Sequence, residues 1–272
     1  REDFIDRVTS RTDLSEFHTS WRRADYLEAL RRGGFPEMQS LPDRLRNTWL
    51  DGYLERVLER DAVMLPGGGQ SARLRSVARL LAANQAGELV KGRIAEQAGI
   101  PATSIQAYLD ALAAIYLVDT LPAWTPNLTR REVARPKSLV SDPALAMRLS
   151  RLTTEQLRPL TSRHIGGLIE GLAIAELRKQ QGWSAVDFAL WHFRTRTGLE
   201  IDTVVELDDG RVIGIEVKAS MTYQADQFKG LRALRDQLGD RFLCGIVLGT
   251  APHGYRYADR LWGLPLAALW EL

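Results

Sequence analysis

The sequence predicts a mixed fold, α+β or α/β, in which a helical N-terminal half precedes an α-β-β-β-α-β domain. Residues Leu74 to Tyr116 contain three successive helical patterns. Residues Leu199 to Lys218 instead alternate between polar and apolar side chains, which is the period of a β-strand. The apolar run Phe242 to Leu248 adds a buried strand. With 272 residues, 45% of them hydrophobic, the chain has room for two packed cores.

The first 66 residues are expected to be a helical segment. Trp21 to Arg32 and Pro42 to Asp61 have helical patterns, and Gly33-Gly34 ends the first of them. The glycines at positions 67, 68 and 69 lack a neighbouring lysine and predict a flexible linker. We therefore place the next domain at residues 70–150.

The domain at residues 70–150 is expected to resemble a winged helix. Three helices and two short strands are predicted, at Leu74–Ala83, Val90–Ala98, Ala102–Tyr116, Leu117–Thr120 and Ser138–Val140. Thr103 or Ser104 is the expected cap of the third helix. The exposed candidates on that helix include Gln106, which can read an adenine, but no lysine or arginine. A structural or protein-contact role is therefore favoured over sequence-specific DNA reading.

The best local basic patch lies just after these helices. It consists of Arg130, Arg131, Arg135 and Lys137, which we identify as candidate nucleic-acid-binding residues. A solvated loop is the alternative interpretation. The net charge of +2 is too small to indicate nucleic-acid binding by itself.

Residues 155–272 predict the α-β-β-β-α-β domain. Its elements are expected at Ile165–Gln181, Ala185–Arg194, Leu199–Leu207, Arg211–Lys218, Tyr223–Leu238 and Phe242–Leu248, with Leu261–Trp270 packing back on them. Ser220 and Thr222 are interpreted as a cap of the second helix.

The alternation of side chains fixes the expected geometry of the hairpin around Asp208-Asp209-Gly210. A three-residue loop with glycine in the left-handed position places Leu207 opposite Arg211 and Asp202 opposite Glu216. A two-residue loop would mix the acidic face with the apolar one, because a slip of one residue moves every side chain to the other face. The hydrophobic pattern therefore selects the three-residue loop.

Two carboxylates placed opposite each other on a sheet repel and require a compensating cation. Mg²⁺ suits Asp202 and Glu216, since one or two carboxylates, waters and substrate phosphate oxygens commonly hold it. Lys218, on the same face, can then orient the attacking water or neutralise phosphate charge. The alternative is a solvated hairpin face with an ion pair between Glu200 and Lys218.

The helix at Ile165–Gln181 is apolar around most of its circumference but carries Glu170 and Glu176. Each buried carboxylate must reach a partner or help to hold a metal ion. The two glutamates lie well apart around the helix, so one site is not expected to use both.

Glu170, Asp202 and the Glu216-Val217-Lys218 tripeptide resemble the motif of the PD-(D/E)XK nuclease superfamily. Several stretches also resemble the C-terminal, nuclease-like portion of prokaryotic AAA-type ATPases, namely Gly33–Glu37, Trp49–Asp61, Arg194–Asp202, Glu216–Ser220 and Leu264–Trp270. The resemblance covers nearly the whole chain. Ile201 stands where the superfamily has the proline of its name, a departure common among relatives.

The superfamily resemblance implies a metal-dependent endonuclease acting on DNA. It assigns metal binding to Glu170, Asp202 and Glu216, with Mg²⁺ or Mn²⁺ as the cofactor, and catalysis to Lys218 together with Asp202 and Glu216. The same fold also hosts inactive members, so a protein-binding, nucleic-acid-binding or regulatory module of the ATPase is the alternative function.

The resemblance also implies that an ATPase domain precedes Arg1 in the intact protein and is the partner of this region. The chain has no phosphate-cradling P-loop, so ATP is expected only through that domain. A homo-oligomer is a further expected assembly. The lone Cys244, the absence of a signal peptide and the absence of a membrane-spanning run favour a cytoplasmic setting. His18, His164, His192 and His253 lack metal-ligand spacing, so no zinc site is expected.

Overall fold

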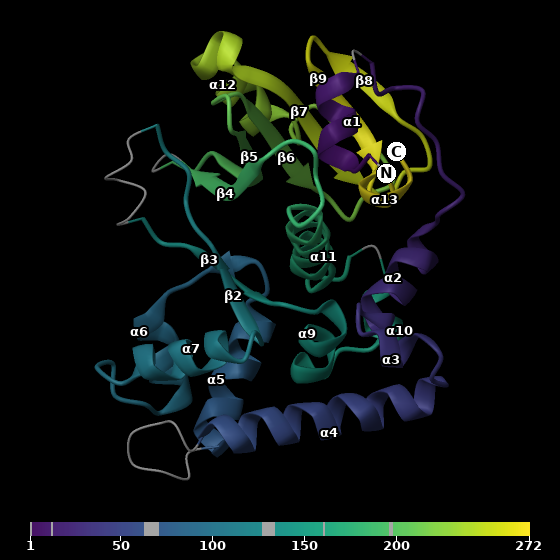
Figure 1. Cartoon of the computed structure of the whole chain (residues 1–272). Helices are drawn as coiled ribbons and strands as arrows, with labels where there is room; N and C mark the ends of the chain where they lie inside the picture. The colour runs from purple at the N-terminus through teal and green to yellow at the C-terminus, as the bar shows by residue number, and fades with distance from the viewer. Residues whose placement is uncertain (1, 12, 63–70, 127–133, 160, 196–197) are drawn as a thin grey trace. The chain divides into compact units, whose positions relative to one another are not determined.

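A computed structural model of the chain describes residues 2–11, 13–62, 71–126, 134–159, 161–195 and 198–272 (Figure 1). The chain divides into two compact units. Unit 1 combines Arg1–Tyr26, Leu121–Ala134 and Leu172–Leu272, and unit 2 combines Leu27–Thr120 and Arg135–Gly171. The units thus join segments from different expected domains. Within the described residues no helix is long and apolar enough to cross a membrane.

Unit 1 is built on a six-stranded mixed sheet with the strand order β4-β5-β6-β7-β9-β8. The strands are β4 (Phe188–Arg194), β5 (Glu200–Leu207), β6 (Val212–Val217), β7 (Phe242–Gly249), β8 (Tyr255–Ala258) and β9 (Leu261–Pro265). Strands β4, β5 and β6 are antiparallel, whereas β7 is parallel to both β6 and β9. The sheet confirms a mixed α and β fold for the C-terminal half.

The expected order of elements around this sheet is present. Helix α11 (Ile165–Gln180) precedes the three antiparallel strands, and helix α12 (Lys229–Leu238) connects β6 to the parallel strand β7. A parallel pair requires a crossover of this kind. Helix α12 begins at Lys229 with Phe228 as its cap residue, so the expected start at Tyr223 is wrong. Ser220 and Thr222 therefore do not cap it, and Ser220 instead bonds within its own turn.

The hairpin has the register that its side-chain alternation predicts. Thr203 pairs with Ile215 and Val205 with Ile213, which continues to Asp202 opposite Glu216. The Leu207 amide donates to the Arg211 carbonyl at 2.9 Å, closing a three-residue loop. Gly210 has φ of 81°, the left-handed conformation that only glycine adopts without strain. The three-residue loop is confirmed.

Helix α12 covers the sheet face that carries Asp202 and Glu216. A Cβ on Gly214 would meet Leu231 at 2.7 Å, so the even-numbered positions of β6 face this helix. A Cβ on Gly230 would lie 2.4 Å from the Glu200 carbonyl oxygen, which shows that α12 and β5 approach closely. The core on this face is made by Val204, Val212, Phe228, Leu231, Leu234 and Phe242, with other apolar side chains around them.

The ends of the chain complete unit 1. Helix α1 (Phe4–Ser10) and helix α13 (Ala268–Glu271) both bond to Gln180 at the end of α11, through the Phe4 amide at 3.3 Å and the Leu269 carbonyl at 2.6 Å. Asp6 also accepts from the Val186 amide at 3.1 Å. The segment before residue 27 therefore contributes to the sheet domain, which the sequence did not predict.

Unit 2 is mainly helical, with a three-stranded sheet of order β1-β3-β2. Its elements are α3 (Pro36–Gln39), α4 (Asp43–Ala62), α5 (Ser71–Ala83), β1 (Gly87–Glu88), α6 (Lys91–Ala98), α7 (Ile105–Ala114), β2 (Val118–Leu121), β3 (Lys137–Val140), α9 (Pro143–Ser150) and α10 (Thr154–Leu157), and α2 (Arg23–Arg32) leads into it. The three expected helices and two strands are present. Ser104 is the cap residue of α7, but its side chain makes no capping hydrogen bond. The expected glycine linker lies outside the described residues.

The first turns of α11 belong to unit 2, where they contact Gln85. A Cβ on Gly167 would lie 2.3 Å from the Gln85 carbonyl oxygen. The Gln85 side chain also accepts from the Val140 amide at 2.8 Å and donates to the Val140 carbonyl at 3.1 Å. The absence of a side chain at Gly167 therefore allows α11 to approach the Gln85 backbone closely.

Candidate active site at the β5–β6 hairpin

Asp202 and Glu216 lie opposite each other on β5 and β6, and Lys218 follows directly after β6. The Lys218 ammonium is 2.5 Å from Glu216 Oε1 and 3.7 Å from Asp202 Oδ2. The structure thus brings together three of the residues that the sequence singled out. Lys218 balances part of the repulsion between the two carboxylates.

The two carboxylates are buried, and Lys218 is partly exposed. Asp202 is 7% exposed and Glu216 is 9% exposed, so the alternative of a solvated hairpin face is wrong for these two residues. The exposed part of the Lys218 side chain amounts to 36%. The two carboxylates are therefore shielded from solvent, and Lys218 is the side chain of the three that solvent reaches most readily.

Asp202 also has a structural function. Its Oδ2 accepts a hydrogen bond from the Val217 amide at 2.8 Å. The ladder pairs between β5 and β6 end at Thr203, so this carboxylate bonds a backbone donor that lies beyond them. Any substitution of Asp202 that removes the acceptor affects both the charge and the hairpin.

Glu200, expected opposite Lys218, has an ion-pair contact on the other side of its strand. Glu200 Oε2 lies 4.0 Å from Arg194 on β4. The ammonium of Lys218 instead lies against Glu216 and Asp202. The lysine is thereby oriented toward the two candidate metal ligands.

Glu170, the third metal ligand implied by the resemblance, is held in unit 2 by Lys137. The Lys137 ammonium lies 2.7 Å from Glu170 Oε1, and the two side chains are 4% and 13% exposed. Among the residues that the structure describes, no three His, Cys, Asp or Glu side chains form a group that could hold a metal ion. A metal role for Glu170 stays a prediction.

The hairpin site lies within a region that is similar to other proteins. Residues 165–269 match a domain of unknown function, DUF4143. Residues 23–156 match a second domain of unknown function, DUF8612. The chain is 28% identical over 241 residues, 86% of its length, to uncharacterised proteins of Mycobacterium bovis and Mycobacterium tuberculosis. It spans about half, 51%, of the length of these curated relatives. No solved structure matches the chain significantly.

The DUF4143 region contains the whole hairpin site, from α11 to β9. Asp202, Glu216 and Lys218 therefore lie in one recurring domain. The basic patch and the three-helix region lie in the DUF8612 segment, at residues 23–156. The two groups of candidate residues thus lie in segments that match different domain models.

The structure describes two of the four residues of the expected basic patch, Arg135 and Lys137. Arg130 and Arg131 lie outside the described residues. Arg135 is exposed and its guanidinium is 2.9 Å from Glu88, while Lys137 is 3% exposed. Lys137 is thus turned inward to Glu170 rather than toward solvent. Its assignment to a nucleic-acid-binding surface does not fit this burial, because a phosphate contact needs an accessible ammonium.

On helix α7, Gln106 is engaged by neighbouring side chains. It accepts from the Lys91 ammonium at 2.6 Å and donates to Asp110 at 2.7 Å. Reading a base would require it to leave both partners. Lys91, from α6, places a positive charge beside α7, a feature that α7 alone did not reveal.

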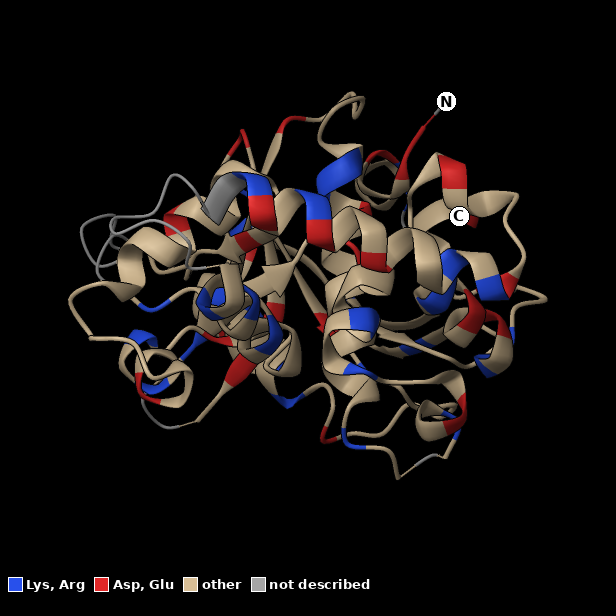
Figure 2. Cartoon of the chain, turned by 90° about the horizontal axis from the view of Figure 1, so that it is seen from below, with Lys and Arg blue, Asp and Glu red and all other residues tan. Residues whose placement is uncertain are grey.

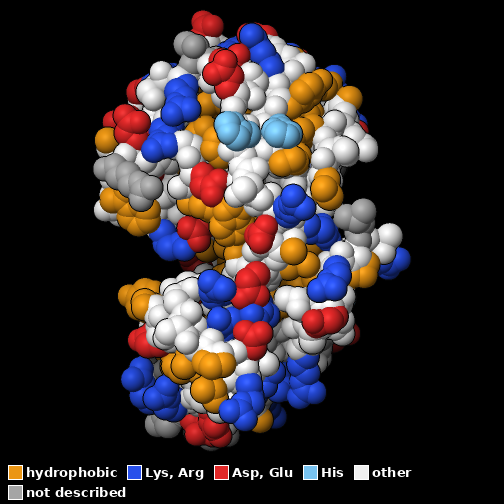
Figure 3. All heavy atoms as spheres, turned by 90° about the vertical axis from the view of Figure 1, so that its right-hand side faces the viewer, with side chains coloured by type: hydrophobic (Ala, Val, Ile, Leu, Met, Phe, Trp, Pro, Cys, Tyr) orange, Lys and Arg blue, Asp and Glu red, His pale blue; other side chains and the backbone are white. Residues whose placement is uncertain are grey.

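The structure brings two distant histidines together in unit 1. His18 and His253 form an isolated antiparallel bridge, and both are exposed; Figure 3 shows histidine side chains (pale blue) side by side on one face. Spacing in the sequence could not reveal this pair. Among the described residues, no third His, Cys, Asp or Glu joins this pair to form a group that could hold a metal ion.

Proposed function

We propose that the hairpin site catalyses Mg²⁺-dependent hydrolysis of phosphodiester bonds in DNA. The observation that supports the proposal is the convergence of Asp202, Glu216 and Lys218 at one end of two adjacent strands. Two carboxylates and one lysine on one face are the groups that such chemistry needs.

The donor set suits a hard divalent cation. Asp202 and Glu216 would hold the ion, and the Val217 carbonyl between Glu216 and Lys218 is an additional candidate ligand. When bound, Mg²⁺ supplies a Lewis acid for the phosphate and for a water. Two buried carboxylates face each other here, an arrangement that a divalent ion stabilises more strongly than one ammonium does.

Lys218 would have a different role. Its ammonium now lies between the two carboxylates, and its stem is partly exposed. If Asp202 and Glu216 held a cation, the Lys218 ammonium would no longer be needed to balance them. It could then orient the attacking water or neutralise charge that develops on the phosphate.

The fold supports the same proposal by analogy. The order α11-β4-β5-β6-α12-β7 resembles the one expected of a PD-(D/E)XK core, and the order of helices and strands from α5 to β3 resembles the one expected of a winged helix. The chain spans half the length of its relatives, which leaves room for the proposed ATPase partner domain in the whole protein.

The second candidate function is a catalytically inactive regulatory or binding module of that ATPase. The ion pairs of Lys218 favour it, since they already balance the carboxylates without a metal ion. In this case the acidic pair serves the architecture, because Asp202 holds the Val217 amide.

The test is a cleavage assay with duplex, four-way branched and single-stranded DNA in Mg²⁺ and in Mn²⁺. Asp202→Asn and Lys218→Met are the test variants. Asn keeps an oxygen that accepts from the Val217 amide, so it removes charge with less damage to the hairpin than Ala. Glu206→Gln is the matched control, since Glu206 lies on the same face of β5, about 13 Å along the strand.

We expect wild type and Glu206→Gln to cleave at least one DNA structure equally, and both test variants to lose at least 100-fold in rate. Calorimetric titration with Mg²⁺ should show weaker binding by Asp202→Asn and unchanged binding by Glu206→Gln. Cleavage by Asp202→Asn at the wild-type rate would remove the proposed site. Absence of cleavage and of Mg²⁺ binding in every protein would favour the regulatory module.

A further inference from the structure

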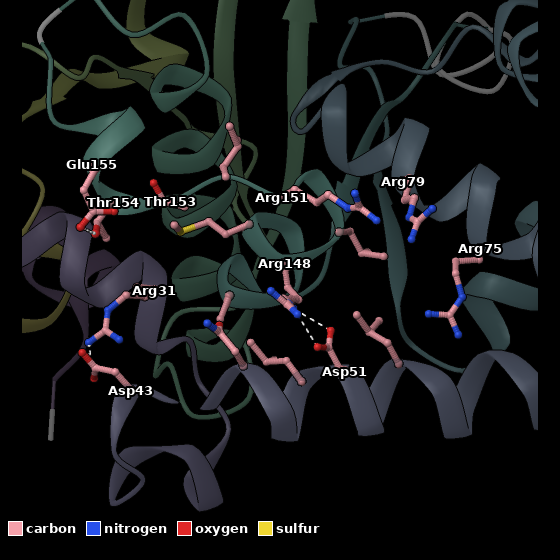
Figure 4. Close-up of a pocket in the computed structure, with 17 residues that line it drawn as sticks. Arg31, Asp43, Asp51, Arg75, Arg79, Arg148, Arg151, Thr153, Thr154 and Glu155 are labelled. Atoms are coloured by element: carbon pink, nitrogen blue, oxygen red, sulfur yellow. Dashed lines mark hydrogen bonds and ion pairs between the residues drawn. The ribbon is translucent and has the colours of Figure 1, made fainter. Parts of the chain in front are cut away.

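Unit 2 contains a pocket of about 660 Å³ that is separate from the hairpin site. It is lined by α4, α5, α9 and α10 and by Arg31 of α2 (Figure 4). Small-molecule sites typically have volumes of about 300–1,000 Å³. The pocket has the size of a nucleotide site.

The charged lining of the pocket has an excess of arginine. Five arginines and three carboxylates line it: Arg31, Arg75, Arg79, Arg148, Arg151, Asp43, Asp51 and Glu155. Two of these arginines are neutralised. Arg31 lies 2.8 Å from Asp43, and Arg148 makes a two-point contact with Asp51 that raises the pKa of its guanidinium.

The remaining three arginines, Arg75, Arg79 and Arg151, form no ion pair or side-chain hydrogen bond with any described residue. Figure 4 shows them on one side of the pocket, away from the Arg31–Asp43 pair and Glu155. Arg75 and Arg79 are four residues apart on α5, so they share a helix face where like charges repel. Three guanidinium groups therefore line one side of the pocket without a carboxylate partner among the residues that the structure describes.

Arg151 occupies a position where glycine is the usual residue. It follows the last turn of α9 with φ of 55°, and its amide and that of Leu152 bond the carbonyls of Arg148 and Met147. Helices commonly end on a left-handed glycine in this motif. The turn at position 151 needs only the left-handed backbone, so it does not explain why an arginine side chain is present there.

The rest of the lining is mixed. Asn47, Thr153 and Thr154 add polar side chains, and an apolar, buried part is provided by Leu50, Leu54, Met147 and Leu149. A concave pocket that combines buried apolar side chains with converging charged groups fits a small molecule, whereas a nucleic-acid surface presents an open row of basic residues. The guanidinium group forms forked hydrogen bonds that fit phosphate oxygens.

We propose that this pocket binds a small polyphosphate-bearing molecule, with Arg75, Arg79 and Arg151 as its phosphate ligands. Free pyrophosphate and a nucleoside diphosphate share this chemistry. The chain has no P-loop, so the arginines of α5 and α9 offer a different route to phosphate recognition. The site lies in unit 2 and is independent of the function proposed for the hairpin.

The experiment is calorimetric titration of the full chain, at constant ionic strength, with pyrophosphate, ADP, adenosine and a single-stranded oligonucleotide. The test variants are Arg79→Gln and Arg151→Gly. Glycine suits the left-handed backbone at position 151, so this variant should melt at the wild-type temperature or above while lacking one guanidinium. Arg44→Gln is the control, because Arg44 is an exposed arginine on α4 that does not line the pocket.

We expect saturable binding of pyrophosphate or ADP by wild type, Arg44→Gln and the hairpin variant Asp202→Asn. Each test variant should bind roughly tenfold more weakly, the loss that accompanies one charge-assisted contact, with an unchanged melting temperature or a higher one. Binding of ADP but not pyrophosphate would identify a nucleotide as the source of the phosphates. The proposal is overturned if neither phosphate ligand binds, if Arg151→Gly binds as wild type does, or if only the oligonucleotide depends on these arginines.

Discussion

At the scale of single residues, the pairing of Lys137 with Glu170 decides how two candidate functional side chains are to be understood. Both are buried in unit 2 and their charged atoms are 2.7 Å apart. Moving either charge out of water is unfavourable unless the partner is present. Each residue therefore has a structural reason to be there, independent of metal or DNA.

We predict that Lys137→Met lowers the free energy of unfolding by about 3–5 kcal/mol, because it leaves the Glu170 carboxylate buried without this cation. The double variant Lys137→Met with Glu170→Leu should recover most of the loss, since an apolar pair removes both charges. Denaturant unfolding measures both values. A double variant as unstable as the single one would contradict the prediction.

The same double variant separates structure from metal binding. If its Mg²⁺ affinity equals that of the wild type, Glu170 is not a ligand of the ion. If the fold is intact and the affinity falls, the metal role implied by the resemblance is supported. Lys218→Met serves as the comparison, because it removes the ammonium of the hairpin site in unit 1 and leaves Glu170 unchanged.

At the scale of elements, local sequence was sufficient for the hairpin but not for its surroundings. The alternation of polar and apolar side chains and the Asp208-Asp209-Gly210 turn were enough to predict the register of β5 and β6. Both depend only on residues that are close together in the sequence. The burial of Lys137 depends on a partner from a helix far along the chain. The arginines of the pocket come from α2, α5, α9 and the residue after α9, so their convergence also requires the tertiary fold.

Several elements had weak sequence signals for physical reasons. Helix α10 has four residues and β8 pairs only at the sheet edge, so each contributes little periodicity. Helix α12 starts six residues later than expected, because the segment after Lys218 forms turns stabilised by Ser220 and Gln227 side chains. Such side-chain bonds compete with helix formation.

The approach of α12 to β5 depends on Gly230. We predict that Gly230→Ala lowers the free energy of unfolding by about 1–3 kcal/mol, because the added Cβ would meet the Glu200 carbonyl oxygen, which belongs to the backbone and cannot rotate away. Thermal and denaturant unfolding measure the change.

Gly92→Ala is the matched control for that substitution. Gly92 is also helical, but a Cβ there meets nothing within 4 Å. This variant should be neutral or up to about 1 kcal/mol more stable, since alanine restricts the unfolded chain. If both alanine variants changed stability equally, close approach of α12 would not be the cause.

At the scale of the whole molecule, charges of both signs are interspersed. The net charge is +2, and Figure 2 shows acidic and basic residues alternating along the elements of the described chain. Many of them form ion pairs, such as Arg31 with Glu28 and Arg148 with Asp51. The described residues therefore do not present the broad positive field that attracts DNA without regard to sequence.

This charge distribution predicts a shallow salt dependence for DNA binding. If the hairpin site engages DNA through a few local contacts, the logarithm of affinity should fall with the logarithm of salt concentration with a slope between about −1 and −3. Fluorescence anisotropy with a labelled duplex, measured in EDTA between 50 and 200 mM salt to prevent cleavage, determines the slope. Lys218→Met should make the slope shallower by about one unit, because one phosphate contact is lost. A wild-type slope steeper than about −6 would contradict the prediction, since it would require many basic side chains to neutralise phosphates together.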